Sequence, residues 1–131
     1  MKTLEKLREE YNNLNKRLNA IYRKIVELER QEITNIFTVG DCYIDTYCKS
    51  FEKVIALDGN VLYCMVVNNE SILRDIYYLY DTKCWKKITS EQFKDIYLAV
   101  LKDIQDPDLD DKESNWLTAY KSIMNSINKG E

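Results

Sequence analysis

The chain has 131 residues and a mass of 15.6 kDa, and its 19 basic and 22 acidic side chains give a formal charge of −3. This length supports one compact domain with an appendage, and an apolar fraction of 45% excludes a chain that is disordered throughout. Because the sequence contains no histidine, Ser-His-Asp and Cys-His nucleophile systems and His-ligated metal sites are excluded. With only three glycines, the chain also cannot form a P-loop or a GxGxxG phosphate-binding turn.

Residues 1–36 are predicted to form a long N-terminal coiled-coil helix. Apolar side chains recur at alternating spacings of three and four residues through four unbroken heptads, which keeps one narrow seam on one side of a helix. At alternating a and d positions, the seam consists of Leu4, Leu7, Tyr11, Leu14, Leu18, Ile21, Ile25 and Leu28. Such a helix is marginal in water unless another apolar surface covers it. The cover is either the same helix of another copy, which makes the seam an oligomerisation surface, or the chain's own C-terminal helices; we favour self-association into a homo-oligomer.

The charges beside the seam do not require two such helices to pair in parallel. Of the flanking g-to-e contacts in a parallel pair, only Lys24 with Glu29 of the partner subunit is attractive. Tyr11 at an a position also fits poorly into a tight two-stranded core. The oligomer number and the helix orientation are therefore left open by the sequence.

Residues 37–131 are predicted to form a compact β-sheet domain with C-terminal helices. Short runs rich in strand-forming residues alternate with turns, and they cover residues 42–47, 51–57, 61–67, 72–80 and 84–88. The Asp58-Gly59-Asn60 turn predicts a hairpin in which Gly59 takes a positive φ, and the almost wholly apolar run 61–67 predicts a central strand buried on both faces. We expect four or five strands in an antiparallel meander, which forms a bent sheet or a small barrel.

Two helices are predicted after the sheet. Thr89 and Gln92 have the spacing of a capping box, and the helix that they begin has a broad apolar stripe suited to packing on a sheet. Pro107 ends this helix, and the acids from Asp108 to Glu113 suit the N-terminus of a last helix. Together with the long N-terminal helix, these elements predict an α+β fold.

Tyrosines are concentrated in the predicted sheet, and most of them are expected to be packing residues with a polar tip. In the run from Ile76 to Tyr80, however, strand alternation places aromatic side chains on both faces, and so small a sheet cannot hide both. This favours a subunit interface, or a surface on which aromatic rings stack a base and basic side chains hold phosphates. The candidate ligand-binding residues are Tyr43, Tyr47, Arg74, Tyr78, Tyr80, Trp85, Lys86 and Lys87.

Acidic side chains gather between the two predicted C-terminal helices. As an interaction surface they imitate the charge of phosphates and suit a basic groove on another protein; as a structural feature they are a solvated loop and helix cap. The candidates for this acidic partner surface are Asp106, Asp108, Asp110, Asp111 and Glu113. A calcium loop is not expected, because Asp111 stands where a glycine is needed and Leu117 where the bidentate glutamate belongs.

No metal, cofactor or catalytic site is expected. The four cysteines are separated by 5, 15 and 19 residues, without the short paired spacings of a zinc site, and we expect thiols in a reducing compartment. Asp41 and Asp45 are the best candidates for an acid–base or metal-binding pair, which is the enzyme alternative. The missing histidines and motifs favour a non-enzymatic protein.

The charge pattern restricts the partners. The opening residues alternate in charge and no apolar run approaches 18 residues, so we expect a cytoplasmic protein that spans no membrane. No segment has the dense basic stripe that direct binding to duplex DNA needs.

Three segments and the N-terminal heptads carry a resemblance. The segments are residues 39–43 (VGDCY), 54–60 (VIALDGN) and 85–93 (WKKITSEQF). In this order of parts, over about residues 1–105, the sequence resembles small accessory proteins of bacteriophages and prophages that combine an N-terminal coiled coil with a compact β domain. The resemblance implies a phage-encoded protein that blocks a bacterial defence system in the host cytoplasm by capturing a protein component or a nucleotide signal. The alternative is a structural or assembly protein that oligomerises through its coiled coil.

Overall fold

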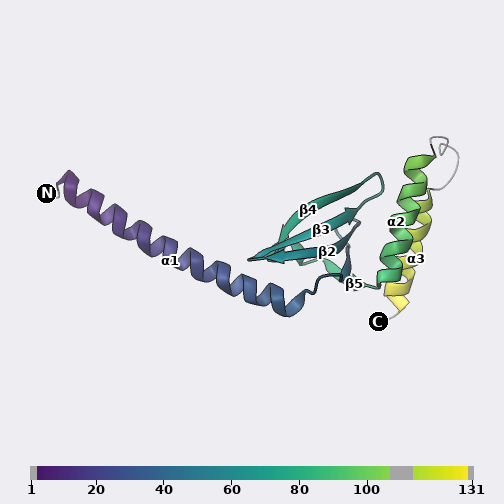
Figure 1. Cartoon of the computed structure of the whole chain (residues 1–131), viewed down its shortest axis with the longest axis horizontal. Helices are drawn as coiled ribbons and strands as arrows, with labels where there is room; N and C mark the ends of the chain where they lie inside the picture. Colours follow the sequence, from purple (N-terminus) through teal and green to yellow (C-terminus); the bar gives the residue numbers. More distant parts are fainter. Residues whose placement is uncertain (1–2, 107–113, 130–131) are drawn as a thin grey trace.

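The computed structural model describes residues 3–106 and 114–129, in which a long helix projects from a layered body (Figure 1). In chain order the elements are α1 (Leu4–Ile36), β1 (Cys42–Asp45), β2 (Ser50–Asp58), β3 (Val61–Val67), β4 (Ile72–Tyr78), the 3₁₀ helix η1 (Leu79–Thr82), β5 (Trp85–Ile88), α2 (Ser90–Gln105) and α3 (Asn115–Lys129). The predicted α+β fold, with a long N-terminal helix, an antiparallel sheet and two C-terminal helices, is confirmed. The sheet is open, with β4 and β5 at its edges, so the barrel alternative is wrong.

Helix α1 is held by the body only at its C-terminal end. Its 33 residues extend for about 50 Å at the usual rise per residue, and the Thr3 side chain caps the first turn by accepting a hydrogen bond from the backbone N–H of Lys6. Ile33 is the one buried residue of the helix, and Val26 and Glu29 are half-buried on the same side. We call these three residues the sheet-facing stripe. The N-terminal part of α1 extends well beyond the body (Figure 1).

The strand order in the sheet is β4-β3-β2-β1-β5, and every neighbouring pair is antiparallel. Strands β1 to β4 form the expected meander, and Gly59 takes a φ of +58° in the hairpin between β2 and β3, as predicted. The chain then departs from a meander, because η1 carries it from β4 at one edge to β5 at the other, where β5 pairs with β1. Tyr80 therefore lies on η1 and not on a strand.

Each face of the sheet carries its own buried cluster. The helix face, which α2 and α3 cover, contributes Cys42, Ile44, Phe51, Val67 and Ile88, and the helices contribute Phe93, Ile96, Val100, Trp116 and Ile123. The opposite face, called the α1 face, contributes Tyr43, Val54, Leu62, Cys64 and Val66, which pack with Ile33 and Phe37 at the end of α1. The sheet is therefore the middle layer between the end of α1 and the pair formed by α2 and α3.

The expectation that β3 is a central strand is confirmed, but the expectation of burial on both faces is wrong at Tyr63. Tyr63 is 42% exposed, whereas its neighbours Leu62 and Cys64 are buried. Helices α2 and α3 cover the helix face near Phe51 and Val67, but this cover does not extend to Tyr63, four residues back along β3. The apolar run reflects full burial of one face and partial burial of the other.

Hydrogen bonds at the helix ends position α2 and α3. Thr89 accepts a hydrogen bond from the Gln92 backbone N–H (3.0 Å) and donates its own backbone N–H to the Gln92 side chain (2.9 Å), so the predicted capping box is confirmed. Helix α3 begins differently, because the Asp103 carboxylate on α2 accepts hydrogen bonds from the backbone N–H groups of Asn115 and Trp116 (2.9 and 2.8 Å). A side chain of α2 thus caps α3 and helps to pair the two helices.

Replacing Ile33 with alanine is expected to lower the free energy of unfolding by about 2–4 kcal/mol, because it opens a cavity where α1 docks on the sheet. The matched control is Ile36→Ala, which removes the same atoms from a side chain that is 56% exposed. This control should change the free energy of unfolding by less than about 1 kcal/mol. Urea unfolding followed by tryptophan fluorescence measures both variants, and equal losses would contradict docking through Ile33.

Candidate interaction surfaces

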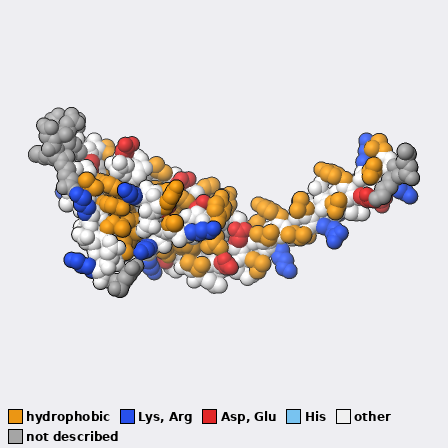
Figure 2. Space-filling model, turned by 180° about the vertical axis from the view of Figure 1, so that it is seen from behind, with side chains coloured by type: hydrophobic (Ala, Val, Ile, Leu, Met, Phe, Trp, Pro, Cys, Tyr) orange, Lys and Arg blue, Asp and Glu red, His pale blue; other side chains and the backbone are white. Residues whose placement is uncertain are grey.

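The heptad seam of α1 is exposed along its whole length. Its eight side chains are between 48% and 65% exposed, and Figure 2 shows hydrophobic side chains along the projecting helix. The alternative in which the chain's own C-terminal helices cover the seam is wrong for the part of the chain that the structure describes. Helices α2 and α3 pack on the helix face of the sheet, whereas α1 docks on the other face.

The seam and the sheet-facing stripe are two different sides of α1. Ile25 and Leu28 belong to the seam and are 48% and 52% exposed, although their sequence neighbour Val26 contributes to the stripe. Beyond Leu28 the heptad places the polar residues Glu32 and Asn35 at the next a and d positions, so the seam ends where the helix docks. The exposed seam therefore extends over four heptads, from Leu4 to Leu28, and is separate from the side of α1 that docks on the sheet.

A second exposed apolar surface lies on the helix face of the sheet, beyond the cover of α2 and α3. Tyr63 on β3 pairs with Ile76 on β4, and Arg74 and Tyr78 lie on the same face of β4 on either side of Ile76. Ile55 lies beside them, where a β-bulge interrupts the pairing of β2 with β3. All five side chains are exposed, and a shallow groove of about 390 Å³ is lined by four of them, Tyr78 excepted. We call these five residues the tyrosine face.

Three of the predicted ligand-binding residues gather at the tyrosine face. Arg74 and Tyr78 belong to it, and the ring of Tyr80 stacks on that of Tyr78 with centroids 6.3 Å apart and planes at 6°. The sequence analysis missed Tyr63, because the apolar run of β3 was interpreted as buried on both faces. Strict alternation places Tyr63 on the face opposite to Leu62 and Cys64, but its exposure depends on how far the helices extend over that face.

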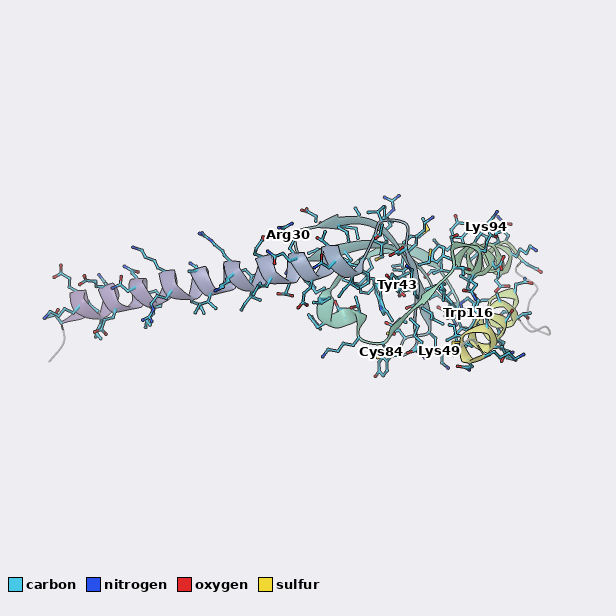
Figure 3. All side chains as sticks on the ribbon, turned by 90° about the horizontal axis from the view of Figure 1, so that it is seen from below. Arg30, Tyr43, Lys49, Cys84, Lys94 and Trp116 are labelled. Atoms are coloured by element: carbon cyan, nitrogen blue, oxygen red, sulfur yellow. The ribbon has the colours of Figure 1, made fainter. Side chains whose placement is uncertain are left out.

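Two other predicted ligand-binding residues are core residues. Tyr43 is 7% exposed and Trp85 is half-buried, their rings lie 5.6 Å apart, and Phe37 packs edge-on against both. Burial and the neighbouring Asp41 carboxylate raise the pKa of Tyr43 to about 12. Figure 3 shows Tyr43 where α1 ends against the sheet. Both rings join the end of α1 to the sheet.

The remaining three predicted ligand-binding residues lie away from the tyrosine face. Tyr47 is 84% exposed in the turn between β1 and β2. Lys86 and Lys87 are exposed on β5, the sheet edge opposite to β4, and the Lys87 ammonium lies 3.6 Å from the Asp41 carboxylate. Within one protomer, the eight predicted residues therefore do not form a single site.

The predicted acidic partner surface falls largely outside the described residues. Asp108, Asp110, Asp111 and Glu113 lie there, and Asp106 is described as the residue that follows α2. The preceding acid of the same run, Asp103, is the N-terminal cap of α3. Asp103 therefore has a structural role, because its carboxylate holds the start of α3 against α2.

Asp41 and Asp45 each accept hydrogen bonds from their own turn. Asp41 accepts from the backbone N–H of Thr38 (3.1 Å), and Asp45 accepts from the backbone N–H groups of Tyr47 and Cys48 (3.0 and 3.1 Å). In residues 3–106 and 114–129, no three Cys, Asp or Glu side chains are arranged to hold a metal ion. These bonds give both carboxylates a structural role in turns.

Glu52 is a buried acid that the sequence analysis missed. It lies on β2 and faces the α1 side of the sheet, is 0% exposed and accepts a hydrogen bond from the Ser50 hydroxyl (2.5 Å). Its second carboxyl oxygen has no hydrogen-bond partner among the described residues. Burial, and to a smaller extent the nearby Asp45 carboxylate, raise the pKa of Glu52 to about 7. The available signal was its alternation with the buried Val54, which places both side chains on one face.

Glu52 is expected to make the protein less stable as the pH rises. Its pKa is 4.5 when unfolded and about 7 when folded, so the folded chain holds the proton more tightly. The resulting stabilisation is complete below pH 4.5 and is lost as the pH rises through 7, with a total of about 3 kcal/mol.

The Glu52→Gln variant, whose amide stays neutral, should be nearly independent of this titration. The matched control is Glu70→Gln on an exposed turn, which should keep the wild-type slope. Urea unfolding at pH 5, 6.5 and 8 measures the free energy of unfolding for all three proteins. A wild-type slope in Glu52→Gln would show that another group is responsible.

Comparisons with protein-family models, with curated proteins and with solved structures find no match to this chain. Among the described residues, no helix is both long and apolar enough to cross a membrane. The interpretation of function therefore depends on the seam and on the tyrosine face.

Proposed function

We propose that the chain is a non-enzymatic binding and assembly protein that pairs with a second copy through the seam of α1. The observation that carries this proposal is the seam itself, with eight exposed apolar side chains in four heptads that the described chain leaves uncovered. The sheet-facing stripe already attaches α1 to the body, and in residues 3–106 and 114–129 the seam is not used for this contact. A seam of only a and d positions suits a two-stranded coiled coil.

The energetics support stable pairing. Pairing would remove the exposed Leu, Ile and Tyr side chains of two seams from water, and burial of apolar side chains is the main favourable contribution to association. The paired helices would then present two sheet bodies, each with an exposed tyrosine face.

The biological setting stays a prediction. We propose, from the resemblance stated above, that the protein is phage-encoded, acts in the host cytoplasm and inhibits a bacterial defence system by capturing one of its components. A self-associating protein with exposed surfaces for binding suits this role, and a purely structural assembly protein is the alternative. Neither role requires a cofactor.

The Leu14→Asp variant is expected to separate the copies, because it places a charge in the centre of the seam. The dissociation constant should rise at least ~100-fold, equivalent to about 2.7 kcal/mol. The matched control is Asn13→Asp, which adds the same charge to the neighbouring position on the outer side of α1. Size-exclusion chromatography with light scattering gives the mass of each protein.

The expected masses are two chains for the wild type and for Asn13→Asp, and one chain for Leu14→Asp. Circular dichroism checks that the body of the variant remains folded. A wild-type protein that is monomeric at tens of micromolar would refute the proposed self-association.

A second candidate function, nucleotide binding, is favoured by the composition of the tyrosine face. Tyr63 and Arg74 are diagonal cross-strand neighbours, which lie about 7–8 Å apart. A base stacked on the Tyr63 ring can therefore place its phosphate at the Arg74 guanidinium. Tyr78 and Tyr80 extend the aromatic surface next to this pair.

Thermal shift measurements with a panel of mono-, di- and cyclic nucleotides test this candidate. A nucleotide at about 100 times its Kd should raise the Tm by several degrees. The shift should disappear in Tyr63→Ala and in Arg74→Gln and persist in Lys83→Gln, which removes an exposed charge elsewhere on the body. No shift with any nucleotide would count against this function.

A further inference from the structure

We infer that the second copy pairs with α1 in the antiparallel direction, so that the two bodies lie at opposite ends of a two-helix rod. This inference rests on the proposed self-association and adds its orientation and register. Four features carry it: the partner that each orientation gives to Tyr11, the position of Glu32 in the heptad, the unequal charge of helix and body, and the half-buried position of Glu29.

An antiparallel pair centred on residue 16 covers the whole seam. Each a residue then meets a d residue of the partner subunit, and the two-fold axis repeats every contact. The core pairs are Leu4 with Leu28, Leu7 with Ile25, Tyr11 with Ile21 and Leu14 with Leu18. All sixteen seam side chains gain an apolar neighbour, and the seam starts and stops at the same places on both helices.

Tyr11 and Glu32 both disfavour the parallel alternative. In a parallel pair, Tyr11 faces Tyr11 of the partner subunit at an a position, where two large rings with polar tips fit poorly. Continuation of the same register places Glu32 opposite Glu32 of the partner subunit, which brings two like charges together. In the antiparallel pair, Tyr11 packs on Ile21 and Glu32 lies beyond the paired seam.

The charge of the chain is unequal between the helix and the body. Residues 37–131 contain 11 basic and 16 acidic side chains, whereas residues 1–18 contain five basic and three acidic side chains. Parallel pairing would place two acidic bodies side by side. Antiparallel pairing separates them and brings the basic first half of each helix close to the acidic body of the other copy. The helix macrodipoles also oppose each other favourably when they are antiparallel.

Lys24 flanks the seam and meets a different acid in each orientation. In the antiparallel register its neighbour is Glu10 of the partner subunit, and in the parallel register it is Glu29. Lys24 and Glu10 are exposed, whereas Glu29 is half-buried on the sheet-facing stripe of its own chain. The antiparallel register also brings Arg17 near Arg17 of the partner subunit, but long exposed side chains can separate in solvent at small energetic cost.

Charge reversal distinguishes the two orientations. Lys24→Glu should weaken the dimer about 10-fold, because it replaces two attractive contacts by two repulsive ones. In the antiparallel dimer the second change Glu10→Lys should restore the affinity to within about 3-fold of the wild type. The matched second change Glu29→Lys should give no such recovery. Analytical ultracentrifugation at low salt measures the dissociation constants.

Recovery by Glu29→Lys, or by neither change, would overturn the antiparallel register while leaving self-association intact. A monomeric wild-type protein would instead refute the proposed function, so the two failures are distinguishable.

Disulfide trapping gives a second readout that does not depend on surface charge. In a Cys48→Ser and Cys84→Ser background, which removes the two exposed thiols, Leu4→Cys and Leu28→Cys proteins are oxidised separately and as a mixture. Antiparallel pairing predicts crosslinked species only in the mixture, because residue 4 of one copy lies beside residue 28 of the other. Crosslinking of Leu4→Cys with itself would overturn the inference.

Discussion

A helix that repeats its apolar side chains every 3.5 residues has one narrow apolar edge, which is stable only when another surface covers it. In this protein α1 docks on the sheet through a different side, and the described residues leave the apolar edge exposed. Helix α1 carries two apolar sides. One, centred on Ile33, is covered by the α1 face of the sheet, and the other, from Leu4 to Leu28, is exposed. Because docking uses a separate stripe, the protomer can fold with its seam still available to a second copy.

The body is layered because different helices close the two faces of the sheet. The α1 face of the sheet is closed by the end of α1 and by η1, and the helix face is closed by α2 and α3 near one end only. The part of the helix face around Tyr63 consequently stays exposed. Because α2 and α3 pack near Phe51 and Val67, Tyr63 and Ile76 lie outside their cover, and the fold leaves an aromatic surface on each body.

The buried Glu52 shows a different kind of constraint. Alternation along β2 places it on the same face as Val54, and its carboxyl group accepts a hydrogen bond from Ser50. A neutral acid is more easily buried than a charged one, which couples the stability of the α1 face to pH. The α1 face of the sheet therefore contains a buried acid through which the stability of the protein depends on pH.

Much of the fold could be predicted from local patterns. The heptads indicated α1, the Asp58-Gly59-Asn60 turn indicated the hairpin between β2 and β3, and the Thr89 capping box indicated the start of α2. The predictions that were wrong, and the features that were missed, concern packing between elements far apart in the sequence. The exposure of Tyr63, the burial of Tyr43 and Trp85, and the capping of α3 by Asp103 all depend on which distant element packs on a given face. Of the candidate ligand-binding residues, Arg74, Tyr78 and Tyr80 gather on one surface and the others do not.

The sequence by itself determined the period of the long helix, the strands and turns of the sheet, and the chemical groups that this chain lacks. These properties depend on neighbours within a few residues, where periodicity and turn chemistry act directly. Only the tertiary structure decided that η1 carries the chain across to β5 beside β1, that α2 and α3 cover the face opposite α1, and that the described residues leave the seam uncovered. Those outcomes depend on contacts between segments far apart in the chain, and a one-dimensional pattern shows that an apolar face needs cover without showing which segment provides it.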